Sequence, residues 1–320
     1  MTTMQSETPD DATALPLRIE PSAHDERSLE SLVAWVMAKR GWLEAKLHRH
    51  GALLLRGFEV DRAAQFELFC RAVDPELKRY VGGESPRTVV AGHVYTSTEY
   101  PSHLEISLHN EACYAREWPR RLYLLCVEPA RHGGETQLAD GRKVLAALDS
   151  AVRQRFTDKQ VMYVRNLQDG PGLGKSWQQT FETEDRDAVE AHCRSEDVEF
   201  EWTDFGLRTR AIRPAVMRHP VTGEEAWFNQ ADQSHVSSRG PRVERSLLRA
   251  MSEDELPRHA LFGDGSPIDR ADLEHVRGVL RGLEVVAPWQ RGDLLLLDNV
   301  LVSHGRKPFE GERRVLVAMA

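Results

Sequence analysis

Two side chains that commonly bind metal ions lie two positions apart in "SLHNEACY", residues 107–114: His109 and Glu111. The residues just before them, "HLEISL", alternate between polar and apolar types, which is typical of a β-strand with one buried face. Because side chains i and i+2 leave the same face of a strand, His109 and Glu111 can reach one ion together. The spacing therefore predicts part of a metal site.

A third ligand would complete this site, and His304 in "DNVLVSHGRKPF" is the strongest candidate because it ends a strand-like run late in the chain. Two histidines and one carboxylate on one face of an octahedron leave three positions open, which is the arrangement found in non-haem Fe(II) oxygenases. Alternatively, His109 and Glu111 lie on the solvated face of a strand and bind no metal. A chance HxE pair is plausible in a chain with 13 histidines in 320 residues. The HxE pair alone does not decide between these interpretations.

Short strands with helices between them are the elements that would position these residues. Residues 27–50 carry apolar side chains at helical spacing, and "GALLLRGF" after them predicts a buried strand. "RRLYLLCVEP" and "GDLLLLDNVLVSHG" predict further strands, whereas residues 141–210 contain helix-like patterns. This mixture favours a mainly β fold with α insertions, built as a sandwich or barrel. We expect a disordered tail over residues 1–20 and a single domain over 21–320 with a helical insert at about 141–210.

Composition excludes several classes of partner. The net charge of −8, the pI of about 5.9 and the lack of a basic block argue against binding to nucleic acid or to an anionic membrane. No apolar stretch approaches the 18 residues of a membrane span, and the first residues are polar and acidic, unlike a signal peptide. We therefore expect a cytoplasmic protein that binds small molecules.

Four ordered segments between about residues 51 and 320 carry a resemblance to a known family: "GALLLRGF", "HNEACYAREWPRRLYLLCVEPARHGGETQLAD", "HPVTGEEAWFN" and "GDLLLLDNVLVSHGRKPFEGERR". Together they resemble the taurine dioxygenase (TauD/TfdA) superfamily of Fe(II)- and 2-oxoglutarate-dependent oxygenases. The glutamate of the HxE pair resembles the branch of clavaminate synthase and the amino-acid β-hydroxylases. The ending "HGRKPFEGERRVLVAM" is similar to the SyrP-like proteins of nonribosomal peptide pathways. The resemblance implies a double-stranded β-helix, or jelly roll.

The same resemblance implies roles for five residues. Fe(II) ligands are expected at His109, Glu111 and His304, and contacts to the co-substrate 2-oxoglutarate are expected from Thr136 of "GGET" and Arg314 of "ERR". An arginine can bind a carboxylate through two parallel hydrogen bonds, and a threonine hydroxyl can donate a further one.

Only one member of the arginine pair Arg313–Arg314 can point into the barrel, because successive side chains of a strand face opposite ways. The family pattern favours Arg314 as the inward residue and leaves Arg313 on the surface. Many family members carry another arginine four residues further on, where this chain has Ala318.

Three further features of the sequence are open to more than one interpretation. Residues 93–103, "HVYTSTEYPSH", predict either an active-site lid or an ordinary loop. Asn229 either lines the site or is satisfied by backbone groups. His219 in "HPVTG" precedes a Thr-Gly turn and predicts a hairpin, and Gly133 and Gly134 predict the turn that orients the following threonine.

The implied activity is an oxidation that consumes 2-oxoglutarate and O2, most often a hydroxylation. The implied substrate is an amino acid or an aminoacyl group in a biosynthetic pathway, either free or attached to a peptidyl-carrier protein. Desaturation, epoxidation and ring formation remain open, as does oxidation of a sulfonate or an aryloxyacetate. Outside this class, a Zn(II) hydrolase or a non-catalytic jelly-roll binding protein could present the same ligands, but a hydrolase would not need both the threonine and the terminal arginine.

Overall fold

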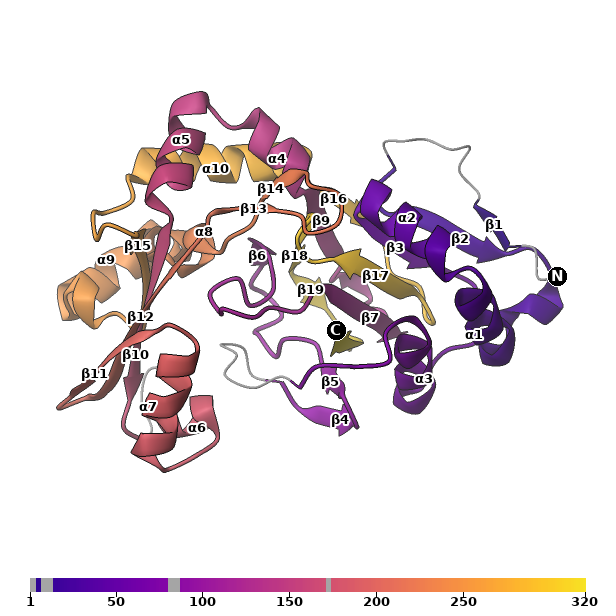
Figure 1. Ribbon diagram of the computed structural model, residues 1–320, viewed down its shortest axis with the longest axis horizontal. Coiled ribbons are helices and arrows are strands. Elements are labelled where there is room, and N and C mark those ends of the chain that lie inside the picture. Colours follow the sequence, from indigo (N-terminus) through magenta and orange to yellow (C-terminus); the bar gives the residue numbers. More distant parts are fainter. Residues whose placement is uncertain (1–3, 7–13, 80–86, 171–173) are drawn as a thin grey trace.

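Two β-sheets share one hydrophobic core in the computed structural model, which describes residues 4–6, 14–79, 87–170 and 174–320 (Figure 1). The larger sheet has eight strands in the order β1 (Met4–Ser6), β2 (Leu17–Pro21), β3 (Ala52–Leu55), β17 (Leu294–Asp298), β7 (Arg121–Glu128), β20 (Arg314–Met319), β5 (Val94–Thr96) and β4 (Val89–Ala91). The smaller sheet has the order β16 (Val285–Ala287), β9 (Thr136–Asp140), β18 (Val302–Arg306) and β6 (Ile106–His109). This arrangement confirms the predicted jelly roll with helical additions.

Both faces of the larger sheet are buried, which explains its uninterrupted apolar runs. In β17, Leu295 and Leu297 belong to the core between the two sheets, whereas Leu294 and Leu296 pack on the opposite side with the helices. Each fully buried leucine contributes about 2 kcal/mol of hydrophobic stabilisation. The helices on that side are α1 (Leu29–Ala38), α2 (Arg40–His50) and α3 (Ala63–Val73).

The N-terminal boundary differs from the prediction. A disordered tail was expected to residue 20, but β2 pairs in parallel with β3, and the side chains of Leu17 and Ile19 are only 1% and 0% exposed. The alternating "LRIE" is a short strand signal that buries every second side chain against α1 and its neighbours. Residues 1–3 and 7–13 of the predicted tail lie outside the described residues.

The predicted helical insert contains helices and also most of a third sheet. Its helices are α4 (Gly141–Ala147), α5 (Ser150–Lys159), α6 (Trp177–Phe181) and α7 (Arg186–Ser195). The sheet has the order β11 (Glu199–Thr203), β12 (Gly206–Arg213), β10 (Val161–Gln168) and β15 (Arg258–Phe262). This third sheet and α7 lie to one side of the jelly roll in Figure 1, and β10 and β15 share a buried hydrophobic cluster with Leu108 of β6 and Ala139 of β9.

The remaining elements connect these sheets. They are the strand pairs β13 (Val216–Arg218) with β14 (Glu225–Trp227) and β8 (His132–Gly133) with β19 (Phe309–Glu310), the helices α8 (Ala231–Ser234), α9 (Pro241–Ala250) and α10 (Arg270–Leu283), and the 3-10 turns His24–Arg27, Val236–Arg239 and Glu253–Glu255. Within the described part of the chain, no helix combines the length and apolar character needed to cross a membrane.

Candidate metal centre and active site

The three side chains predicted as metal ligands lie together at one end of the smaller sheet. His109 ends β6 and is directly opposite His304 on β18, so both imidazoles leave the same face, with ring centroids 4.5 Å apart. Glu111 follows two residues after the strand, and its Oε2 lies 3.7 Å from Nε2 of His304. One donor atom from each of the three residues lies within 4.8 Å of the others.

The surroundings of both histidines favour the neutral form that a metal requires. Burial lowers the pKa of His109, and the positive charges of Arg87 and Arg258 lower it further, against the opposing effects of Glu111 and the Ser107 carbonyl. Nδ1 of His109 donates to that carbonyl oxygen at 2.8 Å, which leaves Nε2 as a lone-pair donor.

Burial lowers the pKa of His304 well below its usual value, and the neighbouring His109 and Arg87 act in the same direction. Two neutral imidazoles and one carboxylate, with no thiolate among them, fit a divalent metal such as Fe(II).

Hydrogen bonds from the turn after β17 fix the backbone that carries Glu111. The Asn299 side chain accepts from the Glu111 N–H at 2.8 Å and donates to the Glu111 carbonyl oxygen at 2.9 Å. Asn110 in turn donates to the Asn299 carbonyl oxygen at 2.7 Å. These three groups are buried, so the amide of Asn299 holds the chain at the carboxylate ligand in a single position.

Arg87 forms a buried ion pair with the same carboxylate. Its Nη2 lies 2.7 Å from Oε2 of Glu111, and the two side chains are 4% and 7% exposed. The guanidinium balances the charge of Glu111 in a position where water cannot do so.

A cavity of about 50 Å³ lies beside the metal ligands inside the jelly roll. His109 and Thr136 line it, together with three arginines: Arg87, Arg306 and Arg313. Thr136 begins β9 and is 8% exposed, so its predicted place near the site agrees with the structure.

The arginine pair is oriented opposite to the prediction. Arg313 points into the cavity, where Nε donates to the Gly134 carbonyl oxygen at 2.8 Å, whereas Arg314 begins β20 as an exposed residue. Along β20, Val315 and Val317 continue the inward face. The expectation that Arg314 faces the site is therefore wrong, because the apolar side chains after it on both faces conceal the inside–outside alternation in the sequence.

Burial lowers the pKa of Arg313 to about 10, and the positive charge of Arg306 contributes to this shift. An anion in the cavity would offset the repulsion between these two guanidinium groups. The position four residues after Arg313 is Val317, so it carries no additional charge.

The "GGET" turn brings its backbone against this arginine. A Cβ at Gly133 would lie 2.1 Å from the Pro308 carbonyl oxygen, and a Cβ at Gly134 would lie 2.9 Å from Cδ of Arg313. Both glycines also have positive φ angles, 70° and 75°. The turn into Thr136 therefore depends on two residues without side chains, as expected.

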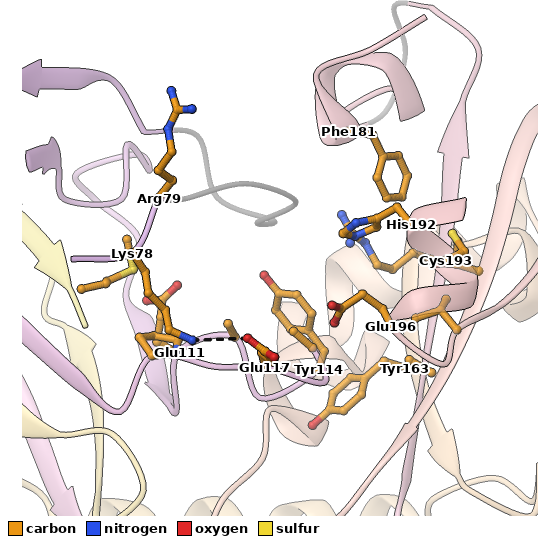
Figure 2. A pocket seen from close by; sticks show the side chains of 18 residues that line it. Lys78, Arg79, Glu111, Tyr114, Glu117, Tyr163, Phe181, His192, Cys193 and Glu196 are labelled. Carbon is orange, nitrogen blue, oxygen red and sulfur yellow. Dashed lines mark ion pairs between the residues drawn. The ribbon is translucent and has the colours of Figure 1, made fainter. Parts of the chain in front are cut away.

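A second and larger cavity, of about 190 Å³, opens on the other side of Glu111 (Figure 2). Figure 2 shows Lys78, Glu111 and Glu117 on one wall and His192 on the opposite wall, with Tyr163 below. Among the described residues, the charged or aromatic side chains that line it are Lys78, Arg79, Glu111, Tyr114, Glu117, Tyr163, Arg165, Phe181, His192 and Glu196. The metal ligands thus lie between a small arginine-lined cavity and a larger mixed one.

The segment predicted as a lid or loop closes part of the smaller cavity. Ser97 and Thr98 line that cavity. Arg306 donates to the carbonyl oxygens of Tyr100, Pro101 and Leu104 at 3.0, 2.7 and 2.8 Å. The segment is thereby attached to the strand that carries His304.

Two other polar residues of the sequence serve the fold. Asn229 donates to the Ala215 carbonyl oxygen and accepts from the Ala231 N–H, both at 3.0 Å, so it is satisfied by backbone groups. His219 lies near His48 and Asp298, but its Nε2 lies 3.0 Å from Asp298 and its Nδ1 accepts from the turn after it, between β13 and β14. The predicted hairpin is confirmed, and hydrogen bonds account for this second cluster.

Three functional candidates were missed in the sequence: Arg87, Arg306 and Asn299. No local sequence pattern marks Arg87 or Arg306, because only the tertiary fold brings these residues to the site. The dipeptide "DN" before the strand of His304 was a usable signal for Asn299, since Asp and Asn commonly organise tight turns by bonding to nearby backbone groups.

Comparison with known proteins defines the class. The model of the family "Taurine catabolism dioxygenase TauD, TfdA family" matches residues 12–319, so the chain belongs to this family. This is a family of dioxygenases, and His109, Glu111 and His304 form the two-histidine, one-carboxylate set that is typical of non-haem iron oxygenases.

Individual relatives agree with this assignment. The chain is 40% identical over 274 residues to the dapdiamide synthesis protein DdaC of Enterobacter agglomerans. The match covers 85% of this chain and 83% of DdaC. It is 33% identical over 305 residues to a clavaminate synthase-like protein of Arabidopsis thaliana, covering 91% and 88%.

Solved structures show the same fold. PvcB of Pseudomonas aeruginosa, described as an Fe, alpha-ketoglutarate dependent oxygenase from an isonitrile synthetic pathway, superposes with a TM-score of 0.54 at 17% identity, covering 99% of this chain and 90% of PvcB. An asparagine oxygenase, crystallised with Fe(II), 3-hydroxyasparagine and succinate, superposes with a TM-score of 0.55 at 12% identity over 91% and 83% of the two chains.

Proposed function

We propose that this enzyme hydroxylates an amino acid or an aminoacyl group in a biosynthetic pathway, with Fe(II) held by His109, Glu111 and His304. The observation that carries the proposal is the place of this triad between two cavities of different character. His109 borders the small arginine-lined cavity, and Glu111 borders the larger one. One cavity suits the co-substrate and the other suits the substrate.

We assign 2-oxoglutarate to the smaller cavity, with Thr136 and Arg313 as its contacts. The planar fork of Arg313 can bind the distal carboxylate through two parallel hydrogen bonds, and the Thr136 hydroxyl can donate another. When bound, Fe(II) and 2-oxoglutarate supply the oxidising chemistry. The segment fixed by Arg306 covers this cavity and limits the access of water.

The larger cavity suits a zwitterionic substrate because it contains groups of both signs. Arg79 and Arg165 supply positive charge, and Glu117 and Glu196 supply negative charge. A buried amino acid needs a partner for its ammonium and another for its carboxylate. DdaC is named for dapdiamide synthesis, and the asparagine oxygenase with the same fold is bound to 3-hydroxyasparagine; these names support a biosynthetic role and the same substrate class.

The proposal leaves the substrate either free or attached to a peptidyl-carrier protein. The cytoplasm is the proposed location.

A panel assay tests this function. Iron-loaded protein is incubated with 2-oxoglutarate, O2 and free amino acids, their carrier-bound thioesters, taurine or an aryloxyacetate, and succinate and product mass are measured together. We expect a gain of one oxygen on an amino-acid member with stoichiometric succinate, and no turnover by His304→Ala. Coupled oxidation of taurine or the aryloxyacetate with no amino-acid turnover would contradict the substrate class. Substrate-dependent succinate formation by His304→Ala would remove that residue from the metal site.

A further inference from the structure

The carboxylates that line the larger cavity differ in their partners. Among the described residues they are those of Glu111, Glu117 and Glu196. Glu111 is paired with Arg87 and is a proposed metal ligand. Glu117 lies 3.7 Å from Nζ of Lys78, and its side chain is 81% exposed. Glu196 is partly buried and forms no ion pair within the described part of the chain, so its carboxylate is open to a positively charged ligand.

Glu196 follows the last residue of α7 and is attached to the loop that carries Glu111. Its Oε2 accepts from the Arg116 N–H at 3.2 Å, and the guanidinium of Arg116 donates to the Ser195 carbonyl oxygen at 3.0 Å. Arg116 lies five residues after Glu111 on this loop. Figure 2 shows the Glu196 side chain pointing into the cavity from the wall opposite Glu111. The loop therefore fixes the position of this carboxylate relative to the metal ligand.

The arginines beside Glu196 bind backbone groups and leave its carboxylate to the cavity. Nη1 of Arg116 is bonded to the Ser195 carbonyl oxygen, and Nη2 of Arg213 donates to the Glu196 carbonyl oxygen at 2.7 Å. Such contacts satisfy the last carbonyl groups of a helix. Oε1 of Glu196 accepts no hydrogen bond from any described residue. An ammonium group, which has three N–H donors, would give this partly buried charge its missing partner.

We propose that Glu196 is the subsite for an ammonium group of the substrate, which sets the substrate class as a primary amine whose carbon chain extends from α7 toward Glu111. This inference rests on the proposed function of the larger cavity as the substrate site. The ammonium can belong to the α-carbon of an amino acid, either free or bound as a thioester, or to the side chain of a diamino acid. Glu196 binds the same group in each case.

Two variants separate the charge of Glu196 from its contact with the loop. Glu196→Gln removes the charge but keeps an oxygen that can accept from the Arg116 N–H. Asp197→Asn is the matched control, because it removes the same charge from the next residue, which is exposed and is not among the residues that line the cavity. Asp197 has a φ angle of 52°, a backbone conformation that asparagine adopts readily.

The first test uses three small amides as probes. L-norvalinamide has its ammonium on the α-carbon, its isomer 5-aminopentanamide has it at the far end of the chain, and pentanamide has none. Anaerobic protein with Fe(II) and saturating 2-oxoglutarate is titrated with each probe at pH 6.5, where both amines are protonated, and at constant ionic strength. The thermal midpoint is recorded. We expect at least one amine to stabilise the wild type, with pentanamide binding at least about tenfold more weakly.

The variants show whether Glu196 is responsible. The Kd of the bound amine should rise at least about tenfold in Glu196→Gln and change by less than about twofold in Asp197→Asn. Glu196→Asp, which keeps the charge on a shorter side chain, should retain part of the affinity. The proposal is overturned if neither amine stabilises the wild type, if pentanamide binds as tightly as the amines, or if the Kd is equal in the wild type and Glu196→Gln.

The same samples separate this inference from the proposed function. Formation of the 2-oxoglutarate chelate is followed by its visible absorption, which Glu196→Gln should leave unchanged because it removes no proposed contact to iron or co-substrate. The midpoint without a probe shows that each variant is folded. An intact chelate with unaltered amine binding in Glu196→Gln contradicts the ammonium subsite alone, whereas the absence of a chelate in the wild type contradicts the proposed function.

The two amines also distinguish the sources of the ammonium. Tighter binding of L-norvalinamide, lost in Glu196→Gln, places the α-ammonium of an amino acid at Glu196. Tighter binding of 5-aminopentanamide, lost in the same variant, places a side-chain ammonium there.

Discussion

Arg313→Gln should weaken the use of 2-oxoglutarate far more than Arg314→Gln, although the two residues are adjacent. The guanidinium of Arg313 lines the cavity of about 50 Å³ beside His109, whereas Arg314 is exposed at the start of β20. Glutamine keeps a polar side chain in both variants. It removes the positive charge and the two-pronged fork.

The expected size follows from the contacts that Arg313 can make. Each hydrogen bond between charged groups contributes about 1.5–3 kcal/mol, so loss of a two-pronged contact in this buried position costs roughly 3 kcal/mol or more. Since about 1.4 kcal/mol corresponds to a factor of ten, the KM for 2-oxoglutarate should rise about 100-fold in Arg313→Gln. For Arg314→Gln we expect a change within about twofold, as for most exposed charges.

The assay is succinate formation at varied 2-oxoglutarate, with the thermal midpoint of each variant measured as a control for folding. Arg313→Lys keeps the charge but not the fork, so its KM should lie between the wild type and Arg313→Gln. A larger effect of Arg314→Gln than of Arg313→Gln would mean that the register of β20 described above is wrong by one residue.

Three further predictions concern the surroundings of the metal site and the stability of the fold. Arg87→Met removes the partner of buried Glu111 and should destabilise the metal-free protein by about 3 kcal/mol. Adding Mn(II) should raise the thermal midpoint of this variant by more than it raises that of the wild type. An unchanged metal-free midpoint would contradict a structural ion pair. Asn299→Ala leaves two backbone groups of Glu111 unpaired, so it should lower the free energy of unfolding by about 1–3 kcal/mol and weaken Fe(II) binding. Urea unfolding and metal titration measure these two effects. Unchanged metal affinity would show that the Asn299 amide does not position Glu111. Burial lowers the pKa of His235 to about 4, with the charges of His259 and Arg277 acting in the same direction, so its folded-state pKa lies below the unfolded value of 6.5. The neutral form is favoured in the fold, and stability should decline as pH falls from about 6.5 toward 4; urea unfolding at pH 7.5, 6 and 5 should show a smaller decline in His235→Asn, and an identical decline would contradict this origin.

Much of the site could be predicted from the sequence because its elements have clear periodicity. The strand before His109 is half-buried, so its alternation is visible, and the i, i+2 rule places Glu111 correctly. His304 was found from a motif, but its direct pairing with His109 depends on the order of strands in the smaller sheet, which no local pattern encodes.

The wrong predictions also arise where the local sequence does not encode the structure. Along β20 apolar residues fill both faces, so nothing in "RRVLVAM" shows that Arg313 and not Arg314 points inward. In the insert, β10 pairs with β15 over a separation of 93 to 101 residues and with β12 on its other side, and residues of β10 and β12 line the larger cavity.

We propose that His109, Glu111 and His304 bind Fe(II) and allow 2-oxoglutarate to join it. The most direct measurement is an anaerobic titration of the protein with Fe(II) in the presence of 2-oxoglutarate, followed by visible absorption. We expect a weak charge-transfer band that saturates at one Fe(II) per chain in the wild type and is lost in His109→Ala, Glu111→Ala and His304→Ala proteins that remain folded. Absence of the band in folded wild-type protein, or its persistence at full intensity in any of the three variants, would contradict the assignment of this metal site.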